Sequence, residues 1–361
     1  MKILVIALSG IGDALMFTPA LQRLSSEMPS AKIDALVMYK GVKDIYKGLP
    51  QISDLIYFDF PNRSVFESLR FVLDLRKKNY DAAISVYPSN RKEYNIINRI
   101  IGADKRFAVD YLHRNFSNLA FLNSPRIKED SSLHNVEENV RMVDALTDKK
   151  TTEIPPMLFN LDESDIKFAD KFREANSISG DDLVIGFHPG CSPLKNHERR
   201  RWELSKFSSL GDKLIKQFGV KILIFGGGDE QALKEQISAR INSPSVIQVN
   251  TASLSNTAAV MKRCNLFITN DSSLMHVASA LKLNVLALIG PTNVNFIHPW
   301  KTDYEIASLN LDCAPCFYYS PKPLTCYRSD VKFKCIKELQ VDFVFEKAAA
   351  QISNLRRRLE T

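Results

Sequence analysis

The chain has little of what marks several common classes of protein. It contains no apolar stretch of about 18 residues that could cross a bilayer. The apolar run at its N-terminus is interrupted by Ser9, Gly10 and Asp13 before the core of a secretory signal peptide is complete. Six cysteines in 361 residues, with no signal peptide, are too few for a disulfide scaffold. We therefore expect a soluble, cytoplasmic protein.

Neither sign of charge dominates the composition. The 48 Lys and Arg residues stand against 41 Asp and Glu residues, a formal net charge of +7. This is far from a histone-like charge density, so nucleic acid is not required as a partner, and anionic ligands or a membrane surface are favoured. No internal repeat, low-complexity segment or convincing Asp-x-Asp metal clamp at a strand end is present. The length and the 45% hydrophobic content are sufficient for two domain cores.

Short apolar runs alternate with amphipathic stretches, which is the pattern of βαβ units. The expected buried strands are Ile3–Leu8, Ile33–Val37, Leu55–Phe58 and Ala82–Val86, followed by Val184–Phe187, Lys221–Phe225, Val246–Val249, Leu266–Thr269 and Val285–Ile289. Between these groups, residues 148–180 are rich in Thr, Pro and charge and indicate a domain boundary. A final helix over Lys337–Leu359 ends in Arg356–Arg358, which forms either a solvated helix end or a membrane contact.

The first strand is followed by a glycine-containing turn with a carboxylate. Gly10 and Gly12 suggest a dinucleotide motif, but its third glycine is replaced by Leu15. Asp13 would repel a pyrophosphate at this turn and suits a general base instead. The alternative is that Asp13 only caps the following helix.

A second strand-to-helix turn follows Leu266–Thr269 and carries Asp271, Ser272 and Ser273. The first backbone N–H groups of a helix that begins here would be unpaired, and they would suit a diphosphate. His276 lies one turn further along the same helical face as Ser272. The alternatives are that Asp271 is an N-cap and that His276 is a buried histidine with satisfied hydrogen bonds.

Two more loops should meet this turn, because the carboxyl ends of parallel strands share one edge of the sheet. One contains Gly190 and continues into the basic segment that includes Lys195 and Arg200; the other contains Gly226, Gly227 and Glu230. The glycines allow close approach of a ligand, and an acid after them can bind ribose hydroxyls. A flexible turn and a solvated basic surface are the alternatives.

These segments together resemble glycosyltransferase family 9, the ADP-heptose:lipopolysaccharide heptosyltransferases. The motifs that carry the resemblance are LVIALSGIGDALMFTPALQRL, IGFHPG with RRRWELSKF, ILIFGGGDE and FITNDSSLMHVASALKLNVLALIGPT. The resemblance implies a GT-B architecture, in which two Rossmann-like, doubly wound domains face a central cleft. It implies an acceptor domain over residues 1–160, a donor domain over 161–336, and a final helix over 337–361 that packs back on the acceptor domain.

By position in the motifs, the resemblance gives Asp13 the role of catalytic base. It places Arg200 near the donor phosphates, Glu230 at the nucleoside and Asp271 near the donor sugar. Ser272, Ser273 and His276 fall on the turn of the phosphate-binding helix, although Ser273 stands where the family commonly has glycine. Catalysis without a metal ion follows, with Arg200, Lys195 and the helix N-terminus opposing the charge of the leaving group.

Two further groups of residues allow more than one interpretation. Cys313, Cys316, Cys326 and Cys335 have a spacing that suits a structural zinc or iron, and they resemble the quartet of protein O-heptosyltransferases, but they could be packing thiols or form a disulfide. A basic patch in the first half could bind an anionic acceptor or be a solvated surface; it contains Arg91, Lys92, Arg99, Lys105, Arg106, His113 and Arg114.

We expect an inverting transferase that moves heptose from ADP-heptose to a lipopolysaccharide or lipooligosaccharide core, without nucleic acid and with peripheral contact at the cytoplasmic face of the inner membrane as an option. A protein hydroxyl is the alternative acceptor, and another sugar nucleotide the alternative donor. A sugar-nucleotide epimerase of related fold and a non-catalytic nucleotide-sugar binding module are the more distant alternatives.

Overall fold

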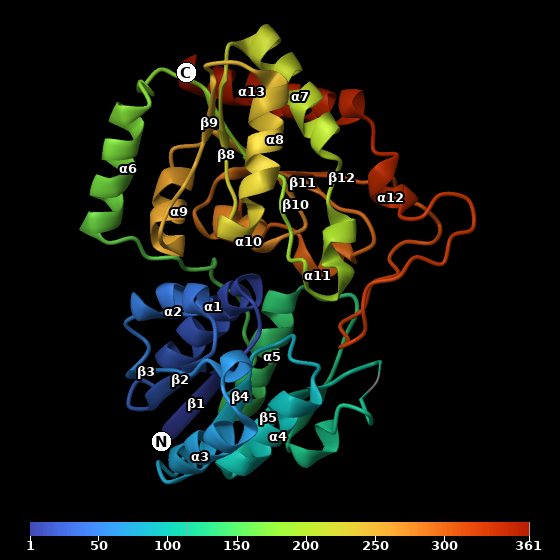
Figure 1. Ribbon diagram of the computed structural model, residues 1–361. Helices are drawn as coiled ribbons and strands as arrows, with labels where there is room; N and C mark the ends of the chain where they lie inside the picture. Colours follow the sequence, from blue (N-terminus) through green and yellow to red (C-terminus); the bar gives the residue numbers. More distant parts are fainter. Residues whose placement is uncertain (114, 361) are drawn as a thin grey trace. The chain divides into compact units, whose positions relative to one another are not determined.

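The computed structural model describes residues 1–113 and 115–360, with the side chains of residues 358–360 excepted, and it divides into two compact units (Figure 1). Unit 1 contains residues 1–160 and 318–321, and unit 2 contains residues 161–317 and the described residues from 322 onward. None of the helices in these ranges combines the length and the apolar character that crossing a membrane requires.

Unit 1 is built on a six-stranded parallel sheet with the strand order β3-β2-β1-β4-β5-β6. Its strands are β1 (Lys2–Ala7), β2 (Lys32–Val37), β3 (Asp54–Tyr57), β4 (Ala82–Ser85), β5 (Lys105–Asp110) and β6 (Arg126–Lys128). Its helices are α1 (Ile11–Glu27), α2 (Lys40–Lys47), α3 (Val65–Arg76), α4 (Lys92–Ile101) and α5 (Asn135–Thr147).

The central strand β1 is buried on both faces, which is why its sequence is a continuous apolar run. Leu4 and Ile6 point to the face that α3 and α4 cover, where Val72 is also buried. Side chains alternate along a strand, so Ile3 and Val5 face the opposite side, and both are buried. The sheet is therefore a doubly wound one with helices on both faces.

Helix α1 continues through Pro19, which has no backbone N–H to bond to the carbonyl of Leu15. The hydroxyl of Thr18 donates to that carbonyl over 2.7 Å, and it accepts a hydrogen bond from the N–H of Leu158 over 2.9 Å. The side chain thus supplies the bond that proline removes. Helix α1 is therefore continuous. It carries Asp13 on its first turn, and the contact of Thr18 with Leu158 anchors it further along.

Unit 2 repeats this architecture with a six-stranded parallel sheet in the order β12-β11-β10-β7-β8-β9. Its strands are β7 (Val184–His188), β8 (Lys221–Ile224), β9 (Val246–Gln248), β10 (Leu266–Asn270), β11 (Asn284–Leu288) and β12 (Tyr304–Ala307). Its helices are α6 (Glu163–Ala175), α7 (Leu204–Phe218), α8 (Gln231–Ile241), α9 (Leu254–Met261), α10 (Ser273–Ala280), α11 (Val294–Ile297), α12 (Lys334–Lys337) and α13 (Val341–Glu360).

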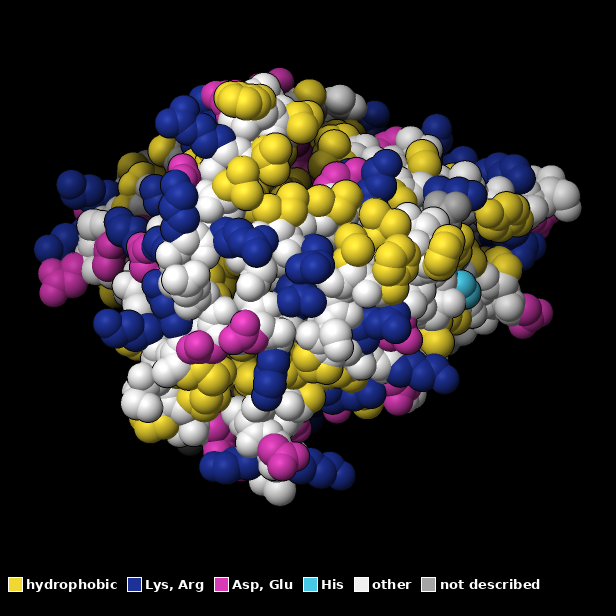
Figure 2. Space-filling model, turned by 90° about the horizontal axis from the view of Figure 1, so that it is seen from below, with side chains coloured by type: hydrophobic (Ala, Val, Ile, Leu, Met, Phe, Trp, Pro, Cys, Tyr) yellow, Lys and Arg dark blue, Asp and Glu magenta, His cyan; other side chains and the backbone are white. Residues whose placement is uncertain are grey.

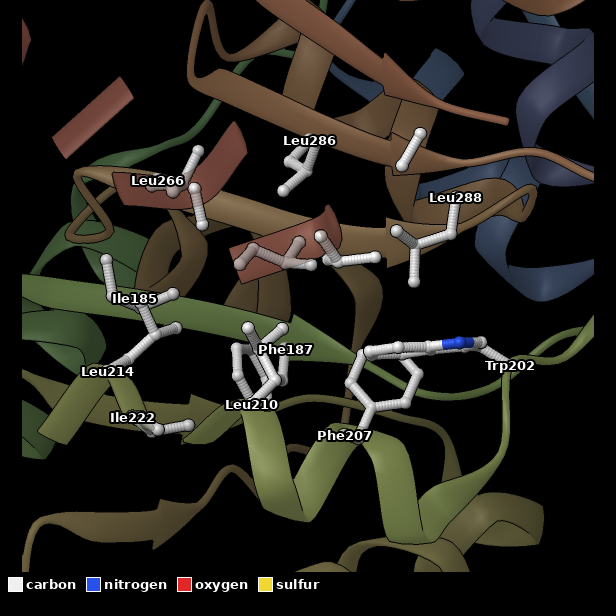
Figure 3. Close-up of a cluster of buried hydrophobic side chains, with 14 of the residues drawn as sticks. Ile185, Phe187, Trp202, Phe207, Leu210, Leu214, Ile222, Leu266, Leu286 and Leu288 are labelled. Atoms are coloured by element: carbon white, nitrogen blue, oxygen red, sulfur yellow. The ribbon is translucent and has the colours of Figure 1, made fainter. Parts of the chain in front are cut away.

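One large apolar cluster holds the sheet of unit 2 against α7 and α13. Figure 3 shows Trp202 and Phe207 beside Phe187, and the Trp202 and Phe207 rings meet edge to face at 5.1 Å. The final helix adds Val344, Ala348 and Ile352 to this cluster. Its apolar stripe packs within unit 2, and the expectation that this helix also packs back on the first domain stays a prediction. The stripe packs within unit 2 because α7 and β12 offer an apolar surface beside it.

Candidate functional site

Each sheet has one topological switch point, where successive strands stop adding on one side of the first strand and continue on its other side. Ligands of α/β sheets bind at this point. In unit 1 it lies between β1 and β4, and in unit 2 between β7 and β10. The loops that follow these four strands carry most of the residues that the sequence selected. In unit 2 the register pairs His188 of β7 with Thr269 of β10, which brings the loops after them together.

Arg200 and Asp271 form a buried ion pair at this edge of unit 2. The Arg200 guanidinium donates to the Asp271 carboxylate over 2.6 Å, and the two side chains are only 11% and 7% exposed. The hydroxyl of Thr292 donates to the same carboxylate oxygen, also over 2.6 Å. Arg200 also lies over the ring of Phe317, 5.4 Å from its centroid. The ion pair therefore fixes a guanidinium at the carboxyl end of the sheet.

A second buried polar group lies beside this ion pair. His188 bridges two of the expected site residues, with Nδ1 2.8 Å from Ser272 Oγ and Nε2 3.1 Å from Glu230 Oε2. The Gly227 N–H donates to Glu230 over 3.0 Å. A Cβ atom on Gly190 would lie 1.8 Å from Glu230 Oε1, so only glycine leaves room for this carboxylate. The three loops thus meet around Glu230.

The charge of Glu230 is fixed by these neighbours. Burial raises the pKa of this carboxyl, but the hydrogen bond and charge of His188, the Gly227 N–H and the charge of Arg201 outweigh burial and lower the pKa to about 2. Gly226 belongs to the same close packing, since a Cβ atom on it would lie 3.0 Å from the Glu230 side chain. Glu230 is therefore ionised throughout the neutral pH range.

Helix α10 begins directly after these residues, with Ser272 as its N-cap and Ser273 as its first residue. His276 lies on the first turns of α10 and is buried. Burial, followed by the charge of His298 and Arg200, lowers its pKa to about 4 against the opposing effect of Asp271, so the ring is neutral. Its Nδ1 atom has no hydrogen-bond partner within the described part of the chain. His276 therefore lies within electrostatic range of both Arg200 and Asp271.

The basic loop after β7 brings Lys195 to the same neighbourhood. Lys195 is half-buried, and its carbonyl accepts a hydrogen bond from the N–H of Leu324 over 2.8 Å. Burial, together with the charges of Arg200 and Lys195, lowers the pKa of His197 to about 4. The loop thus carries a neutral His197 near two cations, Lys195 and Arg200, and its surface is strongly basic.

In unit 1, Asp13 lies on the first turn of α1, three residues after the N-cap Gly10. Its carboxylate accepts a hydrogen bond from the Gly10 N–H over 3.1 Å, and Gly12 is buried inside the helix. The geometry therefore includes the capping contact that was the alternative to a general base. A cap and a base do not exclude one another, because a carboxylate has two oxygens.

Arg91 lies in the same electrostatic environment as Asp13. Burial raises the pKa of Tyr39 and Tyr94, the positive charge of Arg91 opposes this change, and the negative charge of Asp13 adds to it. The Arg91 guanidinium lies 5.6 Å from the ring centroid of Tyr94. Lys92, the first residue of α4, is exposed. Arg114, which the sequence placed in this basic patch, lies outside the described residues.

A loop far along the sequence completes this part of unit 1. Asn90, which follows β4, donates to the carbonyl of Tyr319 over 2.8 Å, and Asn135 donates to the Tyr319 hydroxyl over 2.7 Å. The rings of Tyr87 and Tyr319 meet edge to face at 5.6 Å. Buried amides and phenols therefore hold residues 318–321 in unit 1. No pattern in the sequence indicated this placement.

The four late cysteines do not form the metal site that the sequence suggested. Within residues 1–113 and 115–360, no three His, Cys, Asp or Glu side chains are arranged so that they could hold a metal ion. All four thiols are free. Cys313 accepts a hydrogen bond from Arg328 over 3.5 Å, Cys326 accepts one from the Phe333 N–H over 3.2 Å, and Cys335 is buried. Cys316 is exposed. The expected structural zinc or iron is not supported, although the four thiols lie within electrostatic range of one another.

Sequence reasoning did not select His188 and Thr292 as functional residues. His188 directly follows the predicted strand Val184–Phe187, and Thr292 follows the last apolar strand of the late motif. Both residues lie at the carboxyl end of a parallel strand, and this position was a signal that could have identified them.

Comparison with known proteins gives consistent results along the chain. The model of glycosyltransferase family 9 (heptosyltransferase) matches residues 68–327. The lipooligosaccharide heptosyltransferase 2 of Campylobacter jejuni is 24% identical over 96% of this chain and 98% of its own length. A solved structure of Escherichia coli ADP-heptose lipopolysaccharide heptosyltransferase II has a TM-score of 0.74 at 20% identity, with complete coverage of both chains. A structure of E. coli heptosyltransferase WaaC with ADP has a TM-score of 0.68 at 17% identity, over 97% of this chain and all of the other.

Proposed function

The chain belongs to glycosyltransferase family 9 and is a glycosyltransferase of GT-B architecture, and on this premise we propose that it transfers heptose from ADP-heptose to a hydroxyl of a lipopolysaccharide or lipooligosaccharide core. Relatives that match over almost the whole chain are named lipooligosaccharide heptosyltransferase 2, which supports this proposal. We further propose the acceptor site in unit 1 and the donor site in unit 2.

The observation that carries the donor assignment is the charged edge of unit 2. The Arg200 guanidinium is held by Asp271 beside the first turn of α10, where Ser272 and Ser273 offer backbone N–H groups. A guanidinium and a helix N-terminus are both suited to phosphate oxygens. We propose that they bind the diphosphate of the donor and that Glu230, ionised and held by His188, binds hydroxyls of the nucleoside.

In the proposed reaction, Asp13 takes the proton of an acceptor hydroxyl as its oxygen attacks the anomeric carbon of heptose. The new carbon–oxygen bond forms on the face opposite the bond to the diphosphate, which breaks with its electron pair, so the configuration inverts and ADP leaves. Arg200 and Lys195, with the N-terminus of α10, oppose the charge that develops on the diphosphate. We propose that these groups supply the role for which other transferases use a divalent ion.

The test is to incubate the purified chain with ADP-heptose and a panel of truncated lipopolysaccharide acceptors, with and without EDTA. A heptosylated acceptor, formed equally well with EDTA and bearing inverted anomeric configuration, is the expected product. Donor that changes without acceptor would indicate an epimerase, and donor that binds but stays intact would indicate a binding module. Transfer to a protein hydroxyl alone would replace the proposed acceptor.

A further inference from the structure

Helix α3 in unit 1 has a largely exposed apolar face. Its members are Val65, Phe66, Leu69 and Leu73, which are 85%, 76%, 42% and 45% exposed. At 100° per residue they fall within one quarter to one third of the helix circumference. We call these four residues the outer face of α3. Soluble surfaces carry single exposed apolar residues, whereas a continuous strip of this kind indicates an interaction surface.

The outer face is separate from the packing of α3 in the core. Val72 and Leu75, on the adjoining side of the helix, are buried against the sheet of unit 1. The N-terminus is also held, because the N–H of Glu67 donates to the Ser64 hydroxyl over 3.2 Å and the Glu67 carboxylate accepts from the Ser64 N–H over 2.9 Å. The helix is therefore already folded and anchored, and the outer face is not needed to form it.

The charges around the outer face are mainly positive. Between Arg63 and Lys78 the sequence has five basic residues and two acidic ones. The two acids lie in exposed ion pairs, Glu67 with Arg63 and Asp74 with Lys77, and Lys78 is paired with Asp54. Arg70 is also exposed and follows directly after Leu69. An apolar strip with basic flanks is the arrangement of helices that lie in the interface of a bilayer, with aliphatic and aromatic groups below the headgroups and basic groups at the phosphates.

We propose that the outer face of α3 docks unit 1 on a bilayer that contains anionic lipids. Figure 2 views the molecule from the side on which α3 lies in Figure 1, and apolar side chains gather there among Lys and Arg side chains. A second copy of this chain fits less well, because a two-fold contact through this face would bring the two sets of basic flanks together. The inference rests on the proposed function, since a lipid-linked acceptor is held at such a surface.

The experiment measures binding of the full chain to vesicles by flotation. The vesicles contain phosphatidylethanolamine with phosphatidylglycerol, and neutral phosphatidylcholine vesicles are the comparison. The wild-type chain should float with the anionic vesicles, less so in high salt. Phe66→Ser with Leu69→Ser should weaken this binding roughly tenfold or more, because two apolar side chains are lost from the bilayer. Arg63→Glu with Arg70→Glu should weaken binding to anionic vesicles and leave the weak binding to neutral vesicles unchanged.

The matched control is Ile166→Ser, which changes an equally exposed aliphatic residue on α6 of unit 2, where Ile166 is 44% exposed. This variant should bind vesicles like wild type. All variants should melt at the wild-type temperature, since the changed residues are exposed. Wild-type vesicle binding by Phe66→Ser with Leu69→Ser would overturn the proposal, as would a dimer that this variant converts to monomer without a change in vesicle binding.

A second readout separates this inference from the proposed function. The Phe66→Ser and Leu69→Ser variant should keep wild-type turnover on a deacylated, soluble acceptor and show a raised KM only for acceptor embedded in vesicles. No transfer by wild type to any acceptor would refute the function and leave vesicle binding to be judged by itself. Equal KM values for both acceptor forms would refute the docking surface and leave the function intact.

Discussion

At the β7–β10 edge of unit 2, polar and charged side chains are paired: Arg200 with Asp271, and Glu230 with His188. At the β1–β4 edge of unit 1, amides and phenols dominate, and Asp13 accepts from a backbone N–H. Both edges have the same strand order. The fold therefore gives both units the same kind of sheet edge, and the side chains distinguish the ligands that we propose for each. Fixed charges suit phosphate, whereas amides, phenols and one carboxylate suit hydroxyl groups.

The largest effect is expected from a substitution of Asp13, the carboxylate that distinguishes the edge of unit 1. Asp13→Asn should lower kcat by roughly 10²- to 10⁴-fold, because a general base is lost. The amide oxygen of asparagine can still accept the hydrogen bond of the Gly10 N–H, so the helix cap should survive. The measurements are steady-state turnover, and ADP binding by calorimetry, which should be unchanged. Turnover within a few-fold of wild type in the folded variant would reduce Asp13 to a helix cap.

The next effect is expected at Arg200. Arg200→Ala should weaken ADP binding by roughly 10- to 100-fold, because a charge-assisted contact to phosphate is lost. Adenosine binding should change little. Arg199→Ala is the matched control, since Arg199 is exposed in the same loop. If ADP and adenosine lose affinity equally, Arg200 supports the fold of the site and does not bind phosphate.

A third prediction uses the pH dependence of stability. The pKa of Glu230 is lowered to about 2 in the folded chain, so its carboxylate stabilises the fold above its ordinary pKa of about 4.5, and this contribution is lost as the pH falls from 4.5 to 2. Its size should be on the order of 1–3 kcal/mol. Urea unfolding should therefore show a steeper loss of stability over this range in wild type than in Glu230→Gln. Parallel pH profiles would mean that Glu230 is not held by His188.

Two glycines provide the matched pair for this prediction. Gly190→Ala places a methyl group against Glu230 and should cost about 1–3 kcal/mol of stability. Gly228→Ala meets no atom within 4 Å and should change stability by less than about 0.5 kcal/mol. Similar losses of stability in both variants would mean that the loss comes from reduced loop flexibility and not from contact with Glu230.

The smallest expected effect concerns the acceptor. Arg91→Glu should raise the KM for an anionic acceptor by roughly 3- to 10-fold, since one attractive contact becomes repulsive. Lys92→Glu, at an exposed neighbour, should have a smaller effect. The KM for the donor should stay constant in both variants. An unchanged acceptor KM in Arg91→Glu would mean that this patch is only a solvated surface.

Much of the fold could be predicted because its signals are local. Apolar runs that are buried on both faces, such as Ile3–Leu8, identify central parallel strands whatever lies beside them. The expected strand Ile33–Val37 differs from β2, Lys32–Val37, only at its first residue. The strands β5, β6 and β12 were not predicted. The strands β5 and β6 begin with charged residues, and β6 and β12 lie at sheet edges, where an apolar run is not needed.

The sequence by itself determined the family, the two α/β halves and the turns that carry Asp13 and Asp271, because strand-to-helix turns and their polar residues are contiguous. Only the tertiary structure decided that His188 joins Ser272 to Glu230 and that Tyr319 belongs to unit 1, and only there could a metal-binding arrangement of the cysteines be sought, which the described residues do not support. It also decided that α3 buries Val72 and leaves Phe66 exposed. These facts depend on the register of neighbouring strands and on which helix face meets the sheet, and residues distant in the sequence fix both.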